Sequence, residues 1–294
     1  MTSSAPNTIY QKESGAFFDE GSELHDPELY QPDRQAEQVE TLADIGPEQI
    51  AFYRENGYLS VRQAFNPGEV QGALDGIVSL LMGEKPDFDS VVFEASAREK
   101  LKDLGPQERM DSVRKLGEFE NHEPRLKALS RHPAMLAVIK TLLHDRNPEM
   151  FQDMALLKPP RIGREKPWHQ DHAYFDYPLD TPVVGVWIAL DEATVENGCM
   201  HILPGRHNGP IIHFKRRDWQ ICDKEIMGTK SVAAPLPPGG ALFFDGKLPH
   251  GTPHNTSPNR RRALQFHYAP DDIHKTPPEE RLKHFGSEGK NVSC

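Results

Sequence analysis

The distribution of apolar residues changes at Asn147-Pro148, and this change restricts the fold more than any other feature of the chain. Before it, apolar residues recur at helical spacing; after it, short apolar runs are separated by Gly, Pro and Asn, as in β-strands. These runs are 151–157, 183–190, 200–203, 241–244 and 262–268. Frequent prolines between the runs suit an antiparallel barrel better than a parallel sheet with crossover helices. The sequence predicts a mostly β fold with helical support (α+β), whose core is a double-stranded β-helix, or cupin-like jelly roll.

The segment before this change is predicted to form a layer of helices. Pro47 suits the first turn of a helix, and Gly57 suits its end. Asn66 precedes Pro67 and is a good N-cap for a second helix, which apolar residues continue at helical spacing. The other elements expected here are a strand at 58–61 and helices at about 95–104 and at 133–143.

Residues 1–44 form an acidic N-terminal arm. Ten Asp and Glu residues stand there against Lys12 and Arg34, so the arm carries −8 of the net charge of −10. It has too few large apolar residues to fold alone, so we expect it to be disordered or draped over the body, anchored by Phe17-Phe18. The remaining residues, 45–294, are predicted to form a single domain. Its parts are a helical layer at 45–147, a jelly-roll core at about 148–270 and a C-terminal tail at 271–294.

The composition excludes several classes of protein. With 37% hydrophobic residues the chain can bury a core, so it is neither a fibre nor a fully disordered chain. No apolar stretch approaches the roughly 18 residues that cross a bilayer, and no signal peptide is evident, so we expect a cytoplasmic protein with no membrane partner. An acidic chain with a pI near 5.8 repels phosphate backbones, which argues against nucleic acid as a partner.

The three cysteines, Cys199, Cys222 and Cys294, are widely spaced and form no Cys-x-x-Cys pair. We therefore expect reduced thiols rather than a disulfide framework or a zinc site. The oligomeric state has no signature in the sequence.

A short motif, His169-Gln170-Asp171, follows a proline-rich loop. Side chains alternate along an extended segment, so His169 and Asp171 point to the same side. Two histidines and one carboxylate on one face, with open positions beside them, form the ligand set of many redox-active iron sites. His250 is the candidate for the third ligand, because it follows a buried-looking strand at 242–244. The pair alone is a weak signal, since the chain contains 14 histidines.

The other histidines considered as ligands are not expected to bind the metal. Alternation turns His172 to the opposite face from His169, and His207 and His213 fall in loop-like sequence. The competing residues are His172, His201, His207, His213, His254 and His267.

A basic strand begins about ten residues beyond His250. Within it Arg261 shares a face with Gln265, whereas Arg262 points the other way. A buried arginine requires an anionic partner, and the planar guanidinium pairs best with a carboxylate. Two alternatives are that Arg261 pairs with an acidic residue of the protein, or that it lies on the surface.

Three segments together resemble the phytanoyl-CoA dioxygenase-like family (PhyH) of iron(II) and 2-oxoglutarate oxygenases. They read HQDHAYF, ENGCMHILPGRH and HGTPHNTSPNRRRAL, and the resemblance extends over about 45–269. In that family a His-x-Asp motif and a distal histidine bind iron, which implies His169, Asp171 and His250 as metal ligands. An arginine eleven residues after the distal histidine binds the far carboxylate of 2-oxoglutarate, which implies Arg261 here.

The resemblance implies three further residues in the cosubstrate pocket, Trp187, Thr252 and, on a looser motif, Lys115. It also implies Fe(2+) as cofactor, 2-oxoglutarate and O2 as cosubstrates, and release of succinate and CO2. Related halogenases carry a small residue in place of the carboxylate, so Asp171 indicates hydroxylation. The expected function is that of a 2-oxoglutarate-dependent non-haem iron dioxygenase that hydroxylates a small molecule, whose identity the sequence does not give.

Two alternative functions stay open at this point. A cupin-like metalloenzyme would use the same fold and metal without 2-oxoglutarate, and the role of Arg261 separates it from an oxygenase. A non-catalytic jelly-roll binding protein would carry His169 and Asp171 incidentally, because fold alone does not determine function.

Overall fold

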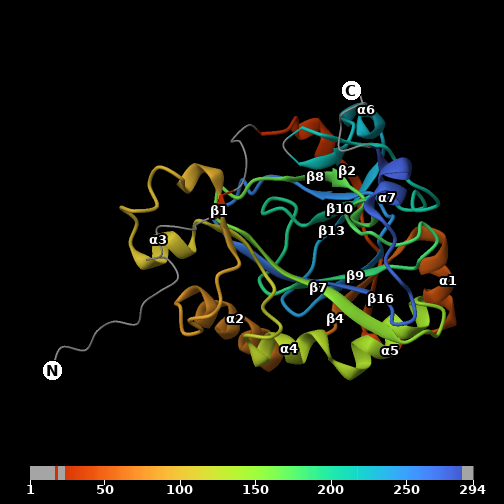
Figure 1. The fold of residues 1–294 in the computed structure, drawn as a ribbon, viewed down its shortest axis with the longest axis horizontal. Coiled ribbons are helices and arrows are strands. Elements are labelled where there is room, and N and C mark those ends of the chain that lie inside the picture. The colour runs from red at the N-terminus through yellow and green to blue at the C-terminus, as the bar shows by residue number, and fades with distance from the viewer. Residues whose placement is uncertain (1–16, 19–23, 217, 287–293) are drawn as a thin grey trace.

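Two β-sheets face each other, and helices cover the outer side of the larger sheet (Figure 1). The computed structural model describes residues 17–18, 24–216, 218–286 and 294. The larger sheet contains, in spatial order, β1 (Phe17–Phe18), β5 (Val91–Phe93), β6 (Val113–Gly117), β7 (Pro148–Lys158), β16 (Arg261–Pro270), β9 (Val184–Ala189), β14 (Ala241–Asp245), β4 (Tyr58–Gln63) and β3 (Gln38–Thr41). The smaller sheet contains β2 (Pro32–Gln35), β13 (Ser231–Ala234), β10 (Met200–Ile202), β15 (His250–Thr252) and β8 (Lys166–His169). Facing sheets of this kind form a jelly-roll core with helical support, as the sequence predicts.

The helices form where caps and apolar spacing agree. The described helices are α1 (Pro47–Asn56), α2 (Pro67–Leu81), α3 (Pro106–Met110), α4 (Pro124–Ser130), α5 (Pro133–Leu142), α6 (Asp223–Ile226) and α7 (Pro278–Phe285). In α2, the Asn66 side chain accepts hydrogen bonds from the backbone N–H groups of Gly68 and Glu69. Its Ile77 and Leu80 are buried against the large sheet, and each such burial contributes about 1.5–3 kcal/mol.

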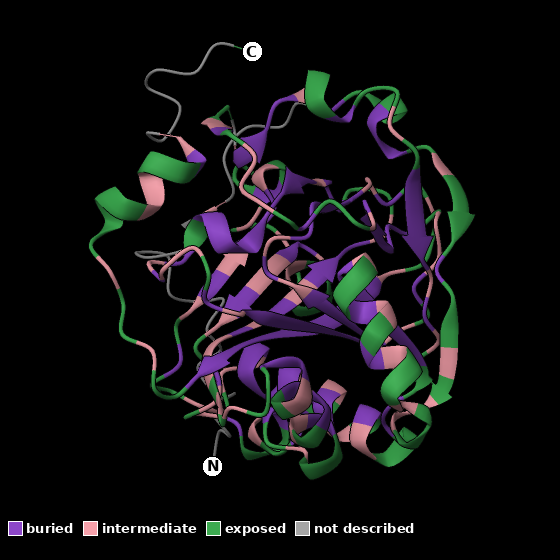
Figure 2. Ribbon diagram, turned by 90° about the vertical axis from the view of Figure 1, so that its right-hand side faces the viewer, coloured by how far each residue is buried: buried purple, intermediate pink, exposed green. Residues whose placement is uncertain are grey.

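Apolar side chains form two main layers. One lies between the helices and the large sheet, and the other lies between the two sheets. Figure 2 shows this distribution, with buried residues concentrated along the strands and on the inner sides of the helices. Apolar side chains do not fill the whole space between the sheets, because a cavity, described below, lies there as well.

The sequence correctly predicts several of these elements and misses others. The predictions for α1, α2, α5, β4 and the five later strands are confirmed within a few residues. The helix expected at 95–104 is wrong: only a 3₁₀ turn at Ala95–Ala97 forms, followed by further turns. This segment buries little besides Ala97, so a helix there would lack an apolar face to pack. Strands β5 and β6 were not expected, and they add to the sheet from within the predicted helical layer.

The described part of the N-terminal arm supplies three short edge strands. Strand β3 pairs in parallel with β4, β2 pairs in parallel with β13, and β1 pairs in parallel with β5. The Phe18 ring lies 5.8 Å from that of Phe93 and beneath the guanidinium of Arg98. Residues 1–16 and 19–23, on which part of the prediction falls, lie outside the described residues. The arm therefore extends both sheets at their edges.

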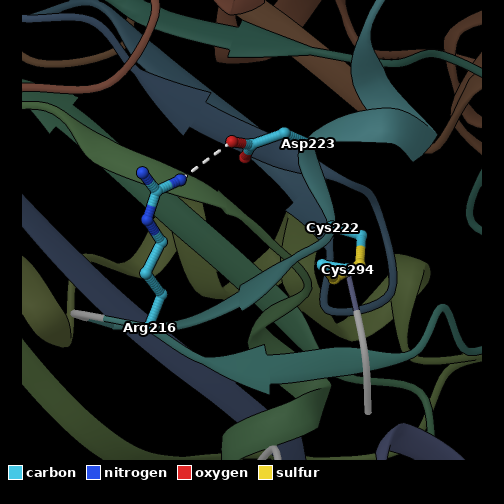
Figure 3. The surroundings of a disulfide bond; sticks show 4 residues. All are labelled: Arg216, Cys222, Asp223 and Cys294. Atoms are coloured by element: carbon cyan, nitrogen blue, oxygen red, sulfur yellow. Dashed lines mark hydrogen bonds and ion pairs between the residues drawn. A yellow bond between two sulfur atoms is a disulfide. The ribbon is translucent and has the colours of Figure 1, made fainter.

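The expectation of three reduced thiols is wrong for two of them. Cys222 forms a disulfide with Cys294, and their Cα atoms lie 5.7 Å apart (Figure 3). Cys222 directly follows β12 (Trp219–Ile221), which pairs with β11 (His213–Lys215). The two cysteines are 72 residues apart in sequence, so only the fold brings them together. Cys199 is buried and free.

Helix α7 packs against the segment η5 (Asp171–Tyr174), which is a 3₁₀ turn. The Arg281 side chain donates to the backbone oxygen of Ala173 at 2.6 Å and to the carboxylate of Asp176 at 2.8 Å. Phe285, at the end of α7, is buried in the same contact. The region expected as a C-terminal tail therefore includes a helix that supports η5. Within the described residues, none of the helices combines the length and apolarity needed to cross a membrane.

Candidate active site

Strands β8 and β15 bring two histidines side by side. The strands are antiparallel, and His169 is paired directly with His250, so both side chains lie on the same face. Their ring centroids are 4.2 Å apart. Asp171 follows His169 by two residues across an extended Gln170, which turns its carboxylate to the same side. The ligand atoms of these three buried residues all lie within 4.8 Å of one another.

Backbone carbonyls fix the orientation of both imidazoles. His169 Nδ1 lies 2.8 Å from the oxygen of Pro167, and His250 Nδ1 lies 2.9 Å from that of Leu248. A carbonyl only accepts, so each Nδ1 donates and each Nε2 keeps its lone pair. Burial, reinforced by the nearby His169, lowers the pKa of His250 to about 3. Both rings therefore turn Nε2, the nitrogen that does not face a backbone carbonyl, toward Asp171 and each other, as metal-binding histidines do.

The Asp171 carboxylate faces His169 through one oxygen and two hydrogen-bond donors, His267 and Gln265, through the other. Its Oδ1 is 3.2 Å from His169 Nε2, and its Oδ2 is 2.7 Å from His267 Nε2 and 3.2 Å from Gln265 Nε2. Burial by itself raises the pKa of this carboxyl group, but the facing histidines and their hydrogen bonds outweigh it and hold the pKa well below its usual value. Asp171 is therefore ionised, as a metal ligand must be.

Arg261 is buried without an acidic partner. Its Nη1 donates to the backbone oxygen of Leu156 at 3.1 Å, and its guanidinium lies 5.2 Å from the ring centre of Trp187. Its Nε is buried with no hydrogen-bond partner, and no carboxylate among the described residues pairs with it. Burial lowers its pKa to about 10, which leaves it charged at neutral pH. Arg261 therefore neither pairs with an acidic residue of the protein nor lies on the surface, and its charge is available to an anionic ligand.

The residues predicted for the cosubstrate pocket line one cavity with the triad. Lys115, Trp187, Thr252 and Arg261 all contribute to a cavity of about 250 Å³. Trp187 Nε1 is buried there with no partner, and Thr252 Oγ1 accepts from the backbone N–H of Lys166 at 3.4 Å. The structure thus brings all seven predicted residues to the walls of a single cavity.

A polar cluster of Tyr174, Lys166 and Asp218 forms part of the cavity wall. Tyr174 is partly exposed, and Lys166 Nζ donates to its hydroxyl at 3.2 Å. The same Nζ lies 3.0 Å from the carboxylate of Asp218. All three residues line the cavity.

The sequence reasoning missed the roles of Gln265 and His267. His267 was weighed only as a ligand, yet its contact is with the Asp171 carboxylate. Alternation along β16 could have found both, because Arg261, Gln265 and His267 are separated by even numbers of residues. The other competing histidines do not line the cavity.

A family model described as phytanoyl-CoA dioxygenase (PhyH) matches residues 53–263, which is more than half of the chain. The protein belongs to the PhyH family. It is a non-haem iron dioxygenase that depends on 2-oxoglutarate. This assignment decides against the two alternative functions.

Curated PhyH relatives match over most of the chain. A probable phytanoyl-CoA dioxygenase of Caenorhabditis elegans is 26% identical over 78% of this chain and 77% of its own. The peroxisomal phytanoyl-CoA dioxygenase of Homo sapiens is 26% identical over 77% of this chain and 69% of its own. A phytanoyl-CoA dioxygenase domain-containing protein 1 of Danio rerio is 32% identical over 58% of this chain and 62% of its own.

Solved structures share the fold of this PhyH protein. EvdO2 from Micromonospora carbonacea, in complex with 2-oxoglutarate, is 26% identical and has a TM-score of 0.63, over 83% of this chain and 98% of its own. The epimerase SnoN from nogalamycin biosynthesis, in complex with Fe3+, alpha-ketoglutarate and nogalamycin RO, is 21% identical. Its TM-score is 0.63 over 79% of this chain and 86% of its own.

Proposed function

We propose that this protein hydroxylates a small molecule, with His169, Asp171 and His250 as its iron ligands. The observation that carries the proposal is the convergence of two imidazoles and one carboxylate beside a buried arginine that has no acidic partner. Two nitrogens and one oxygen suit ferrous iron and leave the remaining coordination positions open.

The donor set fits a resident iron ion. Both histidines are oriented by backbone carbonyls, which is the arrangement that fixes the tautomer of metal-binding histidines. Asp171 supplies the negative charge and fills the position that chloride would need in a halogenase. When bound here, the iron would supply the redox chemistry that couples oxidation of 2-oxoglutarate to succinate and CO2 with hydroxylation of the substrate.

Arg261 would bind the far carboxylate of 2-oxoglutarate. Its buried, unpartnered Nε and the lack of a protein carboxylate support this role. Thr252 would add a hydrogen bond, Lys115 would place a second cation in the pocket, and Trp187 would close the wall and exclude water. The cosubstrate would thus be held at one end by Arg261 and presented to the metal ligands at the other.

The substrate would approach across the cluster of Tyr174, Lys166 and Asp218. This cluster combines an aromatic ring, a cation and a carboxylate in the cavity wall, and its Tyr174 is partly exposed. A small molecule fits a cavity of about 250 Å³ better than a macromolecule does.

The decisive experiment measures binding first and turnover second. Anaerobic calorimetry should detect Fe(II) binding to the wild-type protein, followed by 2-oxoglutarate binding that depends on the metal. Succinate release is then screened across a library of small molecules, with His169→Ala as the inactive control. Failure of the wild-type protein to bind 2-oxoglutarate in the presence of Fe(II) would overturn the proposed function.

A cytoplasmic location remains a prediction. The Cys222–Cys294 disulfide counts against a strongly reducing compartment, where such bonds rarely persist. Alkylation of thiols in freshly lysed cells, followed by mass spectrometry of both cysteines, tests it: blocked thiols would support the prediction, and an intact disulfide would contradict it.

A further inference from the structure

The polar contacts of His267 are with Asp171 and with Gln265, which itself contacts Asp171. Its Nε2 contacts Asp171 Oδ2 and Gln265 Nε2, whereas its Nδ1 is buried with no partner. The ring is fully buried and has Phe151, Phe175 and Phe244 as aromatic neighbours, with centroids 4.9–6.3 Å away. These neighbours keep water away from the contact with Asp171. The polar function of His267 is therefore confined to this carboxylate and its neighbour Gln265.

The two oxygens of Asp171 have different surroundings. Oδ2 receives His267 Nε2 at 2.7 Å and Gln265 Nε2 at 3.2 Å. An ionised carboxylate only accepts, so both side chains donate to Oδ2, and its two lone pairs are engaged. Oδ1 lies 3.2 Å from His169 Nε2, and His250 Nε2 lies farther away, 3.6 Å from Oδ2, whose lone pairs are already occupied. The oxygen that keeps its lone pairs for a metal is therefore Oδ1.

We infer that His267 and Gln265 are positioning residues that restrict Asp171 to binding iron through Oδ1 alone. The inference rests on the proposed function. It adds a reason why the protein would leave some coordination positions of the iron free for other ligands. A carboxylate that bound through both oxygens would occupy one of the positions that 2-oxoglutarate or O2 requires. The same strand β16 carries Arg261, so one element holds the cosubstrate anchor and orients the metal ligand.

The test replaces His267 by a residue that fills its space without donating. His267→Phe suits the aromatic surroundings and removes the hydrogen bond to Oδ2. We expect its Kd for Fe(II), measured anaerobically by calorimetry with the metal alone, to rise about 10- to 100-fold, the usual effect of losing a partner that orients a metal ligand. The visible absorption of the anaerobic Fe(II) complex with 2-oxoglutarate should shift, because the coordination of the carboxylate changes.

Three companion variants separate positioning from packing. His267→Gln retains a donor and should recover most of the lost affinity, and Gln265→Leu should show a smaller loss. His201→Phe is the matched control, because His201 is equally buried but makes no hydrogen bond and does not line the cavity. Its Kd for Fe(II) should stay at the wild-type value.

Several outcomes would overturn the inference. Wild-type affinity in a folded His267→Phe protein, an equal loss in His201→Phe, or no recovery in His267→Gln would each do so. If His267→Phe does not fold, as judged by circular dichroism, Gln265→Leu decides: a raised Kd supports the inference and an unchanged Kd overturns it. A wild-type protein that binds no Fe(II) would instead overturn the proposed function, so the two failures are distinguishable.

Discussion

Both faces of β16 are buried along most of the strand, but their partners differ. One face lies in the apolar layer against the helices, through Leu264, Phe266 and Tyr268. The other face meets the cavity or the metal-ligand candidates, through Arg261, Gln265 and His267. Burial therefore does not distinguish a stabilising side chain from a functional one in this strand. The distinction lies in whether the partner is an apolar group or a group that acts on a ligand.

Loss of the metal-binding carboxylate should have the largest effect. Asp171→Ala is expected to lower iron-dependent succinate formation at least about 100-fold, because it removes a ligand rather than a supporting residue. The free energy of unfolding should change little, since apolar layers on both sides of the large sheet stabilise the fold. Coupled turnover and urea unfolding assays measure both. An unfolded variant would mean that the site is needed for the fold.

The apolar face should show the opposite response. Phe266→Ala deletes a fully buried ring that contacts Phe119, and we expect the free energy of unfolding to fall by about 3–5 kcal/mol. The Kd for Fe(II) of the folded protein should remain at the wild-type value. Urea unfolding and calorimetry provide the two measurements. A large loss of metal affinity would show that the apolar face of β16 also supports the metal site, which would contradict the difference described above.

A pH dependence extends the comparison to β10, where Met200 lines the cavity and His201 points away from it. Burial lowers the pKa of His201 from 6.5 to about 4. Below pH 6.5 the unfolded chain therefore binds more protons than the folded protein, so the free energy of unfolding falls as the pH drops. The contribution of His201 to this loss is about 3 kcal/mol at pH 4. His201→Leu should reduce the loss between pH 7 and pH 4, and an unchanged pH profile of urea unfolding would contradict this assignment.

Arg261 and Arg262 are neighbours in β16 that lie on opposite faces of the strand, so they test the difference between the faces with the same residue type. Arg261→Ala should weaken 2-oxoglutarate binding by about 1.5–3 kcal/mol, or roughly 10- to 150-fold, the range for hydrogen bonds to charged groups. Arg262 points away and pairs with Asp191 at 2.7 and 2.8 Å, so Arg262→Ala is the matched control. Calorimetry with 2-oxoglutarate in the presence of Fe(II) compares them. An unchanged Kd in Arg261→Ala, or an equal loss in both variants, would assign the carboxylate to another residue.

Local sequence was sufficient to predict elements whose start or end depends on residues within one helical turn or one strand. The cap of α2 at Asn66 and the end of α1 at Gly57, where φ is +80°, follow from residues next to each other in the chain. The His169–Asp171 pair follows from strand alternation. His250 and the inward face of Arg261 also came from the strands that carry them, whereas the resemblance to a known family implied the role of Arg261 and added Trp187, Thr252 and Lys115.

The tertiary structure decided what depends on residues that are distant in sequence. The direct pairing of His169 with His250, the disulfide between Cys222 and Cys294, and the contact of His267 with Asp171 all join segments at least 72 residues apart. Strands β5 and β6 are only three and five residues long, and neighbouring strands of the large sheet satisfy their backbone groups. Local sequence determined many of the elements and brought together two of the three candidate metal ligands, His169 and Asp171. The fold decided which atoms of those elements meet, because hydrogen bonds and disulfides require closeness in space and not in sequence.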